Sequence, residues 1–253
     1  MTVLQFAGFL ACVAVAAAAQ SVTGFAMALI LLGLTGLFKL APLPDVANVA
    51  TVLSLAHAAI ALHGPKRQVE GLVFRNTVPA SFFGVAAGVA LLAWLSANIV
   101  MVLQLLLGIV VIACAVIVLV RTEPLAQGSS PASFRGFGFL SGLLGGLFAA
   151  SGPPLVYQFY RQPLPLDRIR DTLVASLAAG SVIRLAMVVA SGQFSLRSLW
   201  MCATAMPLAM AISWWMRRRP PPWDRNAVLK IVCVLLVITG TGLAGPALQA
   251  LFR

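Results

Sequence analysis

Acidic side chains are scarce in this chain: six of its 253 residues are Asp or Glu, against 17 that are Lys or Arg. Charged residues together make up 9% of the sequence, whereas apolar residues make up 61%, and the mean hydropathy is +1.01. A soluble domain of this length could not cover so much apolar surface. The sequence therefore predicts an all-α integral membrane protein whose outward faces contact the lipid bilayer.

The signatures of several other classes of protein are also lacking. The excess of basic residues is not interleaved with aromatic side chains on a polar domain, so no nucleic-acid partner is predicted. The four cysteines lie in apolar runs without CxxC spacing, which favours packing over disulfides or a metal site. No GxxxxGK[ST] motif and no basic segment before the first apolar run are present, so we expect no bound cofactor and no cleaved signal peptide.

Eight apolar segments are long enough to be membrane helices in a window of about 20 residues. A polar linker divides them into two groups of four, which predicts a first membrane repeat at 1–120, a cytoplasmic linker at 121–133 and a second membrane repeat at 134–253. The segments are 3–38, 45–62, 72–95, 99–120, 134–160, 169–190, 196–216 and 227–250.

The first segment of each half contains a break. The stretch from Gln20 to Phe25 interrupts one, and Ser151-Gly152-Pro153-Pro154 interrupts the other. Proline and glycine leave backbone groups that lipid cannot satisfy, so such a break is tolerated only inside protein or beside a cavity. Matching breaks in two halves are typical of the substrate site of a secondary transporter.

The distribution of basic residues bears on how the broken segments lie in the membrane. If every segment crosses once, the Lys and Arg outside segment interiors divide nine to seven between the two sides. If each broken segment folds back as a hairpin, they divide thirteen to three, with Lys39, Arg197 and Arg253 as the minority. The positive-inside rule favours the second arrangement, with the larger group in the cytoplasm. The competing topology keeps 134–160 as one kinked crossing.

The fold-back arrangement gives each half a re-entrant hairpin and three full crossings. An odd number of crossings inverts the second half relative to the first. The predicted fold is therefore two inverted repeats in a multi-pass protein of the cell inner membrane, a common design for secondary transporters.

Arg184 is a cation about 21 Å along its predicted helix from Arg170, past the membrane centre. A charge there costs roughly 3 kcal/mol or more unless it is paired or hydrated. Two interpretations stay open: Arg184 is a ligand for an anion in a shared cavity, or it reaches the interface or a backbone carbonyl. The segment centres contain no Asp or Glu, which favours an anionic rather than a cationic substrate.

The remaining candidate residues lie around the breaks and in the first half. Half-helices that begin after Thr23 and Pro154 would present N–H donors and positive dipole ends to an anion. His57 is either a packed hydrogen-bonding residue or a proton carrier. Tyr157 is either a site residue or a side chain at the membrane interface. The complete set of predicted substrate-binding residues is Gln20, Thr23, Gly24, Phe25, His57, Ser151, Gly152, Pro153, Pro154, Tyr157 and Arg184, with no metal ligand and no catalytic residue.

The residues around both breaks resemble the signatures of the sulfite exporter TauE/SafE family. The stretch 138–146 continued by 151–155 resembles the second signature, 23–32 resembles the first, and 163–170 resembles the approach to the next helix. Ala26 stands where a second glycine is common in the family. The resemblance implies an inner-membrane permease that exports small sulfur-containing anions such as sulfite or organosulfonates.

The sequence thus predicts a transporter of a small anion, rather than an enzyme, that works by alternating access around the two breaks. Two other functions stay open. An anion channel would share the same interior, and Ser151 with His57 would supply the dyad of an intramembrane serine hydrolase. The expected partners are the anion and the bilayer, and a homodimer is an open alternative.

Overall fold

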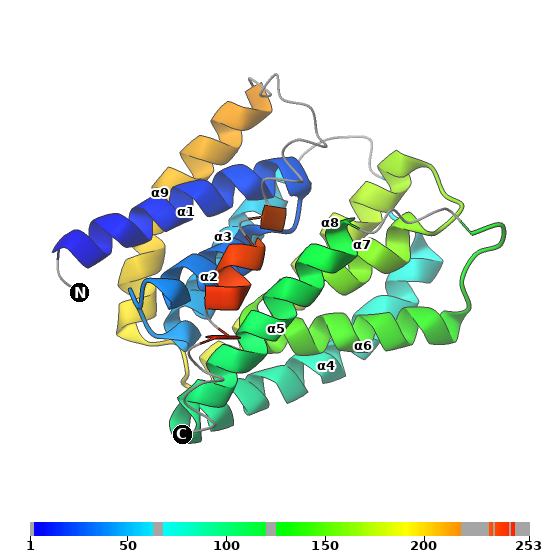
Figure 1. Cartoon of the computed structure of the whole chain (residues 1–253). Coiled ribbons are helices and arrows are strands. Elements are labelled where there is room, and N and C mark those ends of the chain that lie inside the picture. The colour runs from blue at the N-terminus through cyan, green and yellow to red at the C-terminus, as the bar shows by residue number, and fades with distance from the viewer. Residues whose placement is uncertain are drawn as a thin grey trace.

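The computed structural model describes residues 3–62, 68–119, 125–218, 233–234, 236–242 and 244–245. Within these ranges it contains helices and their connections and no β-strand, so the predicted all-α fold is confirmed. Most of the eighth predicted segment and part of the predicted linker lie outside the described residues. The labelled helices are α1 (Val3–Thr23), α2 (Met27–Leu37), α3 (Leu43–Ala61), α4 (Gly71–Asn98), α5 (Val100–Leu119), α6 (Pro131–Phe148), α7 (Gly152–Tyr160), α8 (Leu166–Ala190) and α9 (Leu196–Arg218) (Figure 1).

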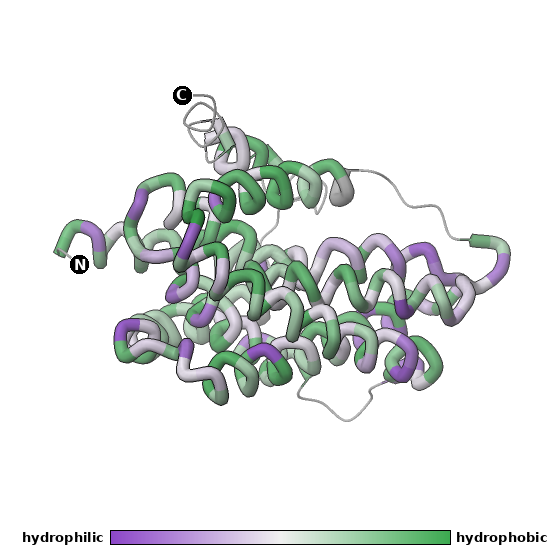
Figure 2. Tube along the Cα trace, turned by 90° about the horizontal axis from the view of Figure 1, so that it is seen from below, coloured by the Kyte–Doolittle hydropathy of each residue, from purple (hydrophilic) through white to green (hydrophobic). Residues whose placement is uncertain are grey.

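The helices have the length and composition of a multi-pass membrane protein. Among the described residues, five are long and apolar enough to cross a bilayer: α1, α3, α4, α8 and α9. Hydrophobic residues cover most of the helix lengths, and hydrophilic residues gather mainly near helix ends and connections (Figure 2). Helix α2 is apolar on all sides and its residues from Met27 to Leu32 are at most 2% exposed, as expected of a helix enclosed by other helices.

Both broken segments fold back on themselves. Gly24 has a φ of +84°, and the chain reverses there so that Leu40, just after α2, lies against Gly8 near the start of α1. In the second half the Phe134 and Phe159 rings are 6.3 Å apart, which places the end of α7 beside the start of α6. The fold-back of 134–160 that the charge distribution favoured is therefore present, and the single kinked crossing is not.

Glycines bring α4 and α6 into backbone contact. Gly138, Gly142 and Gly146 recur every fourth residue on α6 and face Thr77, Ser81 and Val85 on α4, so the two helices run parallel. A methyl group at Gly142 would lie 2.2 Å from the Ser81 carbonyl oxygen. Small residues at this spacing allow close packing of membrane helices. We call this contact the glycine seam.

The long helices form two sets that run in opposite directions. Asp45 and His57 of α3 contact Ser198 and Ser213 of α9, so α3 and α9 are parallel. Helix α8 runs parallel to α4, because Glu70 at the N-cap of α4 bonds Thr172 near the start of α8. Arg184, late in α8, bonds Thr51 in the first half of α3, so α3 and α8 are antiparallel.

Candidate functional site

A cavity of about 40 Å³ lies where the two breaks meet the middles of α3 and α8. One water needs roughly 10–15 Å³ measured in this way, so the cavity has room for about three waters or one small polyatomic ion. The breaks touch beside it, since a methyl group at Gly152 would lie 2.5 Å from the Phe25 Cβ. The lining residues are Gln20, Gly24, Phe25, Ser54, His57, Ala58, Ala149, Ser151, Gly152, Val174, Leu177, Ala178 and Ser181.

The first break is capped by its own side chains. Gln20 donates from Nε2 to the Gly24 carbonyl at 3.1 Å and accepts at Oε1 from the Met27 amide at 2.9 Å. Thr23 Oγ1 accepts from the amides of Phe25 and Ala26. Of the N–H donors expected at the start of α2, the amides of Phe25, Ala26 and Met27 are therefore occupied by these two side chains in this conformation.

The second break is built differently. Helix α6 ends at Phe148, and Ala149 follows in the left-handed region with a φ of +54°. Ser151 is the N-cap of α7 but makes no capping hydrogen bond through its side chain, and its carbonyl accepts from Ser141 Oγ at 2.7 Å. Pro153 and Pro154 form the first turn of α7, are buried and are not in the lining. Because proline has no N–H, α7 offers fewer backbone donors than the sequence argument assumed.

Hydroxyl groups and one imidazole are the polar groups that the cavity leaves available. Within the described residues, the side chains of Ser54, Ser151 and Ser181 make no hydrogen bond to the protein. His57 Nδ1 lies 3.3 Å from Ser213 Oγ on α9. The hydrogen bond of His57 thus goes to Ser213 rather than to Ser151, so the arrangement lacks the serine–histidine contact that activates a hydrolase nucleophile.

Arg184 is 1% exposed and lies outside the cavity lining. Its Nε donates to the Gly146 carbonyl of α6 at 3.1 Å. Its Nη1 donates to three oxygens of α3: the Ala47 carbonyl at 3.3 Å, Asn48 Oδ1 at 3.2 Å and Thr51 Oγ1 at 2.7 Å. Nη2 is buried without a partner. In this conformation Arg184 thus joins three helices, as in the alternative in which it pairs with backbone carbonyls.

The structure therefore divides the predicted site residues into two groups. Gln20, Gly24, Phe25, His57, Ser151 and Gly152 come together around the cavity. Thr23, Pro153, Pro154, Tyr157 and Arg184 are not in its lining. The Tyr157 hydroxyl accepts from Arg161 Nη1 at 3.0 Å, near the end of α7.

The wall on α8 was missed by the sequence argument. Val174, Leu177, Ala178 and Ser181 follow the spacing of one helical face, but the face is mostly apolar and its serine is inconspicuous. The more polar stripe of α8, formed by Thr172, Ser176, Gly180 and Arg184, is instead buried against other helices. A cavity walled by small apolar residues leaves little signal in one sequence.

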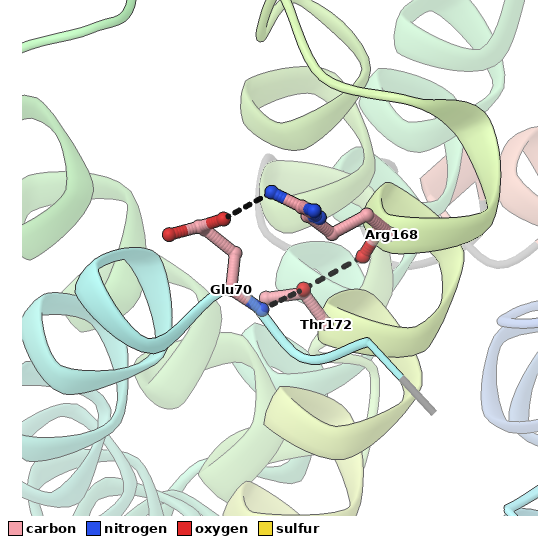
Figure 3. A network of polar contacts seen from close by, with 3 residues as sticks. All are labelled: Glu70, Arg168 and Thr172. Atoms are coloured by element: carbon pink, nitrogen blue, oxygen red, sulfur yellow. Dashed lines mark hydrogen bonds and ion pairs between the residues drawn. The ribbon is translucent and has the colours of Figure 1, made fainter. Parts of the chain in front are cut away.

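Polar contacts join neighbouring elements at each end of the α3 and α8 pair. At the start of α8, Glu70 Oε2 and Arg168 Nη1 are 3.2 Å apart, and the Glu70 amide donates to Thr172 Oγ1 at 2.9 Å (Figure 3). The Gln68 amide donates to Asp171 Oδ2 at 3.1 Å. We call these contacts the α8 latch.

A corresponding set lies at the start of α3. Asp45 Oδ1 accepts from Ser198 Oγ at 2.7 Å, and Asn48 Nδ2 donates to the Gln193 carbonyl at 3.1 Å. We call these contacts the α3 latch. Asp45 and Asn48 are the third and sixth residues after the N-cap Pro42, as Arg168 and Asp171 are after the N-cap Pro165. The two latches thus use the same positions of two antiparallel helices and lie at opposite ends of the pair.

Comparisons with known proteins agree on one family. The family model described as "Sulfite exporter TauE/SafE" matches residues 9–243. A curated relative from Cupriavidus necator, named "Probable sulfite/organosulfonate exporter TauE", is 33% identical over 231 residues, which cover 91% of this chain and 90% of the relative. No solved structure matches the chain significantly. From a match over nearly its whole length, this chain belongs to the sulfite exporter TauE/SafE family.

Proposed function

We propose that this protein is a secondary transporter that exports a small anion, sulfite or an organosulfonate, across the cell inner membrane by alternating access. The observation that carries the proposal is the convergence of both breaks on one cavity. The family description and the name of the Cupriavidus necator relative support the substrate class. The five long apolar helices support a multi-pass membrane location.

The cavity suits a compact oxyanion. Sulfite has four non-hydrogen atoms, about the content of the three waters that the volume admits. The hydroxyls of Ser54, Ser151 and Ser181 come from three different elements and would donate to its oxygens. Of the sequence-predicted residues, we therefore place those of the lining in contact with the anion. We propose that Thr23 and Gln20 stabilise the backbone of the first break. We propose that Arg184 supplies positive potential without contacting the anion.

The packing supports two inverted repeats, at 1–120 and 134–253. Helix α4 packs on α6 and α8, and its counterpart α9 packs on α1 and α3. The contacts across the halves thus occur in matched pairs. The counterparts α3 and α8 are antiparallel, as inversion requires.

The two latches are candidates for the gates of alternating access. Each ties the start of one cavity helix to the connection that leads away from the other, and they lie at opposite ends. We propose that breaking the α8 latch opens the cavity to the cytoplasm, and that breaking the α3 latch opens it to the opposite side. Arg135 and Arg168 lie at the end of the α8 latch and Arg197 at the end of the α3 latch, which supports this orientation.

Two neighbouring alanines on α3 provide a test. Ala58 lines the cavity, whereas Ala59 is exposed on the outside of the same helix. In proteoliposomes loaded with sulfite, we expect Ala58→Phe to stop saturable efflux, because the ring fills the cavity, and Ala59→Phe to leave it unchanged. Equal efflux in both variants would contradict the proposed site. Single-channel currents in place of saturable flux would favour the channel alternative.

A further inference from the structure

An anion in the cavity needs a positive partner. Burying an unpaired charge away from water is costly, and neutral hydroxyls only partly compensate. Arg184 already donates to four protein oxygens and is not in the lining. At the first break, Gln20 and Thr23 already accept from the amides of Phe25, Ala26 and Met27. Arg184 can therefore act only at a distance, and a cation that contacts the anion must come from another residue of the lining.

Among the described residues that line the cavity, His57 is the one with a side chain that can become a cation near neutral pH. Its Nδ1 faces Ser213 Oγ, which leaves Nε2 for the cavity. When the ring takes up a proton, both nitrogens become donors: Nδ1–H donates to Ser213 Oγ, and Nε2–H can donate to an anion oxygen. Neutral His57 can accept from the Ser213 hydroxyl at Nδ1 and donate from Nε2, but it then carries no positive charge to balance the anion.

The other ionisable groups on the helices around α3 do not supply a fixed counter-charge for an imidazolium. Arg170 on α8 has a basic side chain, so it would repel an imidazolium rather than balance it. Asp45 and Asp171 are engaged in the two latches. The other residues of ionisable type in the sequences of the described helices packed against α3 are Arg75 of α4, Arg135 of α6, Asp167, Arg168 and Arg184 of α8, and Arg197, Arg217 and Arg218 of α9.

We infer that the cavity takes up one proton on His57 with each anion, so that His57 couples anion transport to proton movement. This inference rests on the proposed function. The proton comes from water on the side to which the cavity is open, resides on the imidazole while the anion is bound, and returns to water when the anion leaves. No other bond is made or broken.

The test uses an anion whose own charge does not change with pH. Ethanesulfonate stays singly charged between about pH 5 and pH 8, the range in which histidine titrates. We expect its apparent Kd for the purified full-length protein to rise about tenfold per pH unit on the alkaline side of the His57 titration. Calorimetry in buffers of different ionisation enthalpy should show uptake of close to one proton per bound anion at the alkaline end.

Two histidine variants identify the group. His57→Gln should remove the pH dependence and the proton uptake. His63→Gln changes the other histidine of the chain, which lies outside the described residues, and should keep both. Proton uptake by the unaltered protein is a measurement that does not depend on the folding of a variant.

Two results would overturn the inference while leaving the proposed function intact. One is binding of ethanesulfonate by the unaltered protein with a constant Kd and no proton uptake over this range. The other is a pH dependence that persists in His57→Gln. If neither ethanesulfonate nor sulfite binds at any pH, the proposed function fails and the inference fails with it.

Discussion

The backbone contact between α4 and α6 predicts how one added methyl group would change the stability of the protein. Gly142 lies in the glycine seam, where an added Cβ would be 2.2 Å from the Ser81 carbonyl oxygen and 2.8 Å from the Ser81 Cα. Both are backbone atoms, so no side chain can rotate to make room. Relief requires α4 and α6 to separate by about 1 Å, which disturbs the contacts along the whole seam.

The magnitude follows from the balance of two effects. Replacing Gly by Ala in a helix gains up to about 1 kcal/mol from helix propensity. Overpacking a tight interior costs about 1–3 kcal/mol, and a backbone contact this short belongs at the upper end. We therefore expect Gly142→Ala to lower the free energy of unfolding by about 2 kcal/mol. Thermal or denaturant unfolding of the detergent-solubilised protein measures this loss.

Gly136 is a matched control on the same helix. It lies six residues earlier on α6, and an added Cβ there meets nothing within 4 Å. Gly136→Ala should therefore keep the stability or raise it by less than about 1 kcal/mol. If both variants have the same stability, α4 and α6 do not pack as closely as described, and the reasoning about the seam is refuted.

Three further changes probe the site and its surroundings. Arg184→Ala removes four hydrogen bonds from a charged donor and should lower the free energy of unfolding by about 3 kcal/mol or more. A loss below about 1 kcal/mol in chemical denaturation would contradict the role of Arg184 as a link between helices. Ala149→Gly should raise the melting temperature, because the φ of +54° costs alanine about 1 kcal/mol that glycine avoids. An unchanged or lower melting temperature would argue against a left-handed Ala149. The latches are tested with Ser54→Cys in a chain whose four native cysteines are replaced, by labelling with a membrane-impermeant thiol reagent. Glu70→Ala should increase labelling from the cytoplasmic side, and Asp45→Ala should increase it from the opposite side. An increase on the same side in both variants would exclude gates at opposite ends.

The features that were predicted correctly from sequence are those with a local or compositional cause. The breaks at Gly24 and at 151–154 follow from proline and glycine inside apolar runs, which interrupt helices whatever surrounds them. The fold-back of both broken segments followed from the division of basic residues between the two sides.

The features that were missed depend on contacts between distant residues. Self-capping of the first break requires Gln20 to reach Met27, and nothing in the two residue types specifies this contact. Ala149 adopts a left-handed conformation that usually favours glycine, because the packing of the second break imposes it. The position of Arg184 outside the cavity depends on where α3 and α6 offer acceptors, and one chain read alone does not show that.

The glycine seam has a mechanical consequence. It joins α4, from the amino-terminal half, to α6, from the carboxy-terminal half, with almost no space between their backbones. A hinge motion that separated the two halves at the 121–133 boundary would have to break the glycine seam between α4 and α6. If the protein works by the proposed alternating access, each moving body must instead combine parts of both halves: α4 with α6, α7 and α8 in one, and α9 with α1, α2 and α3 in the other. The proposed sequence repeats would then not be the units that move.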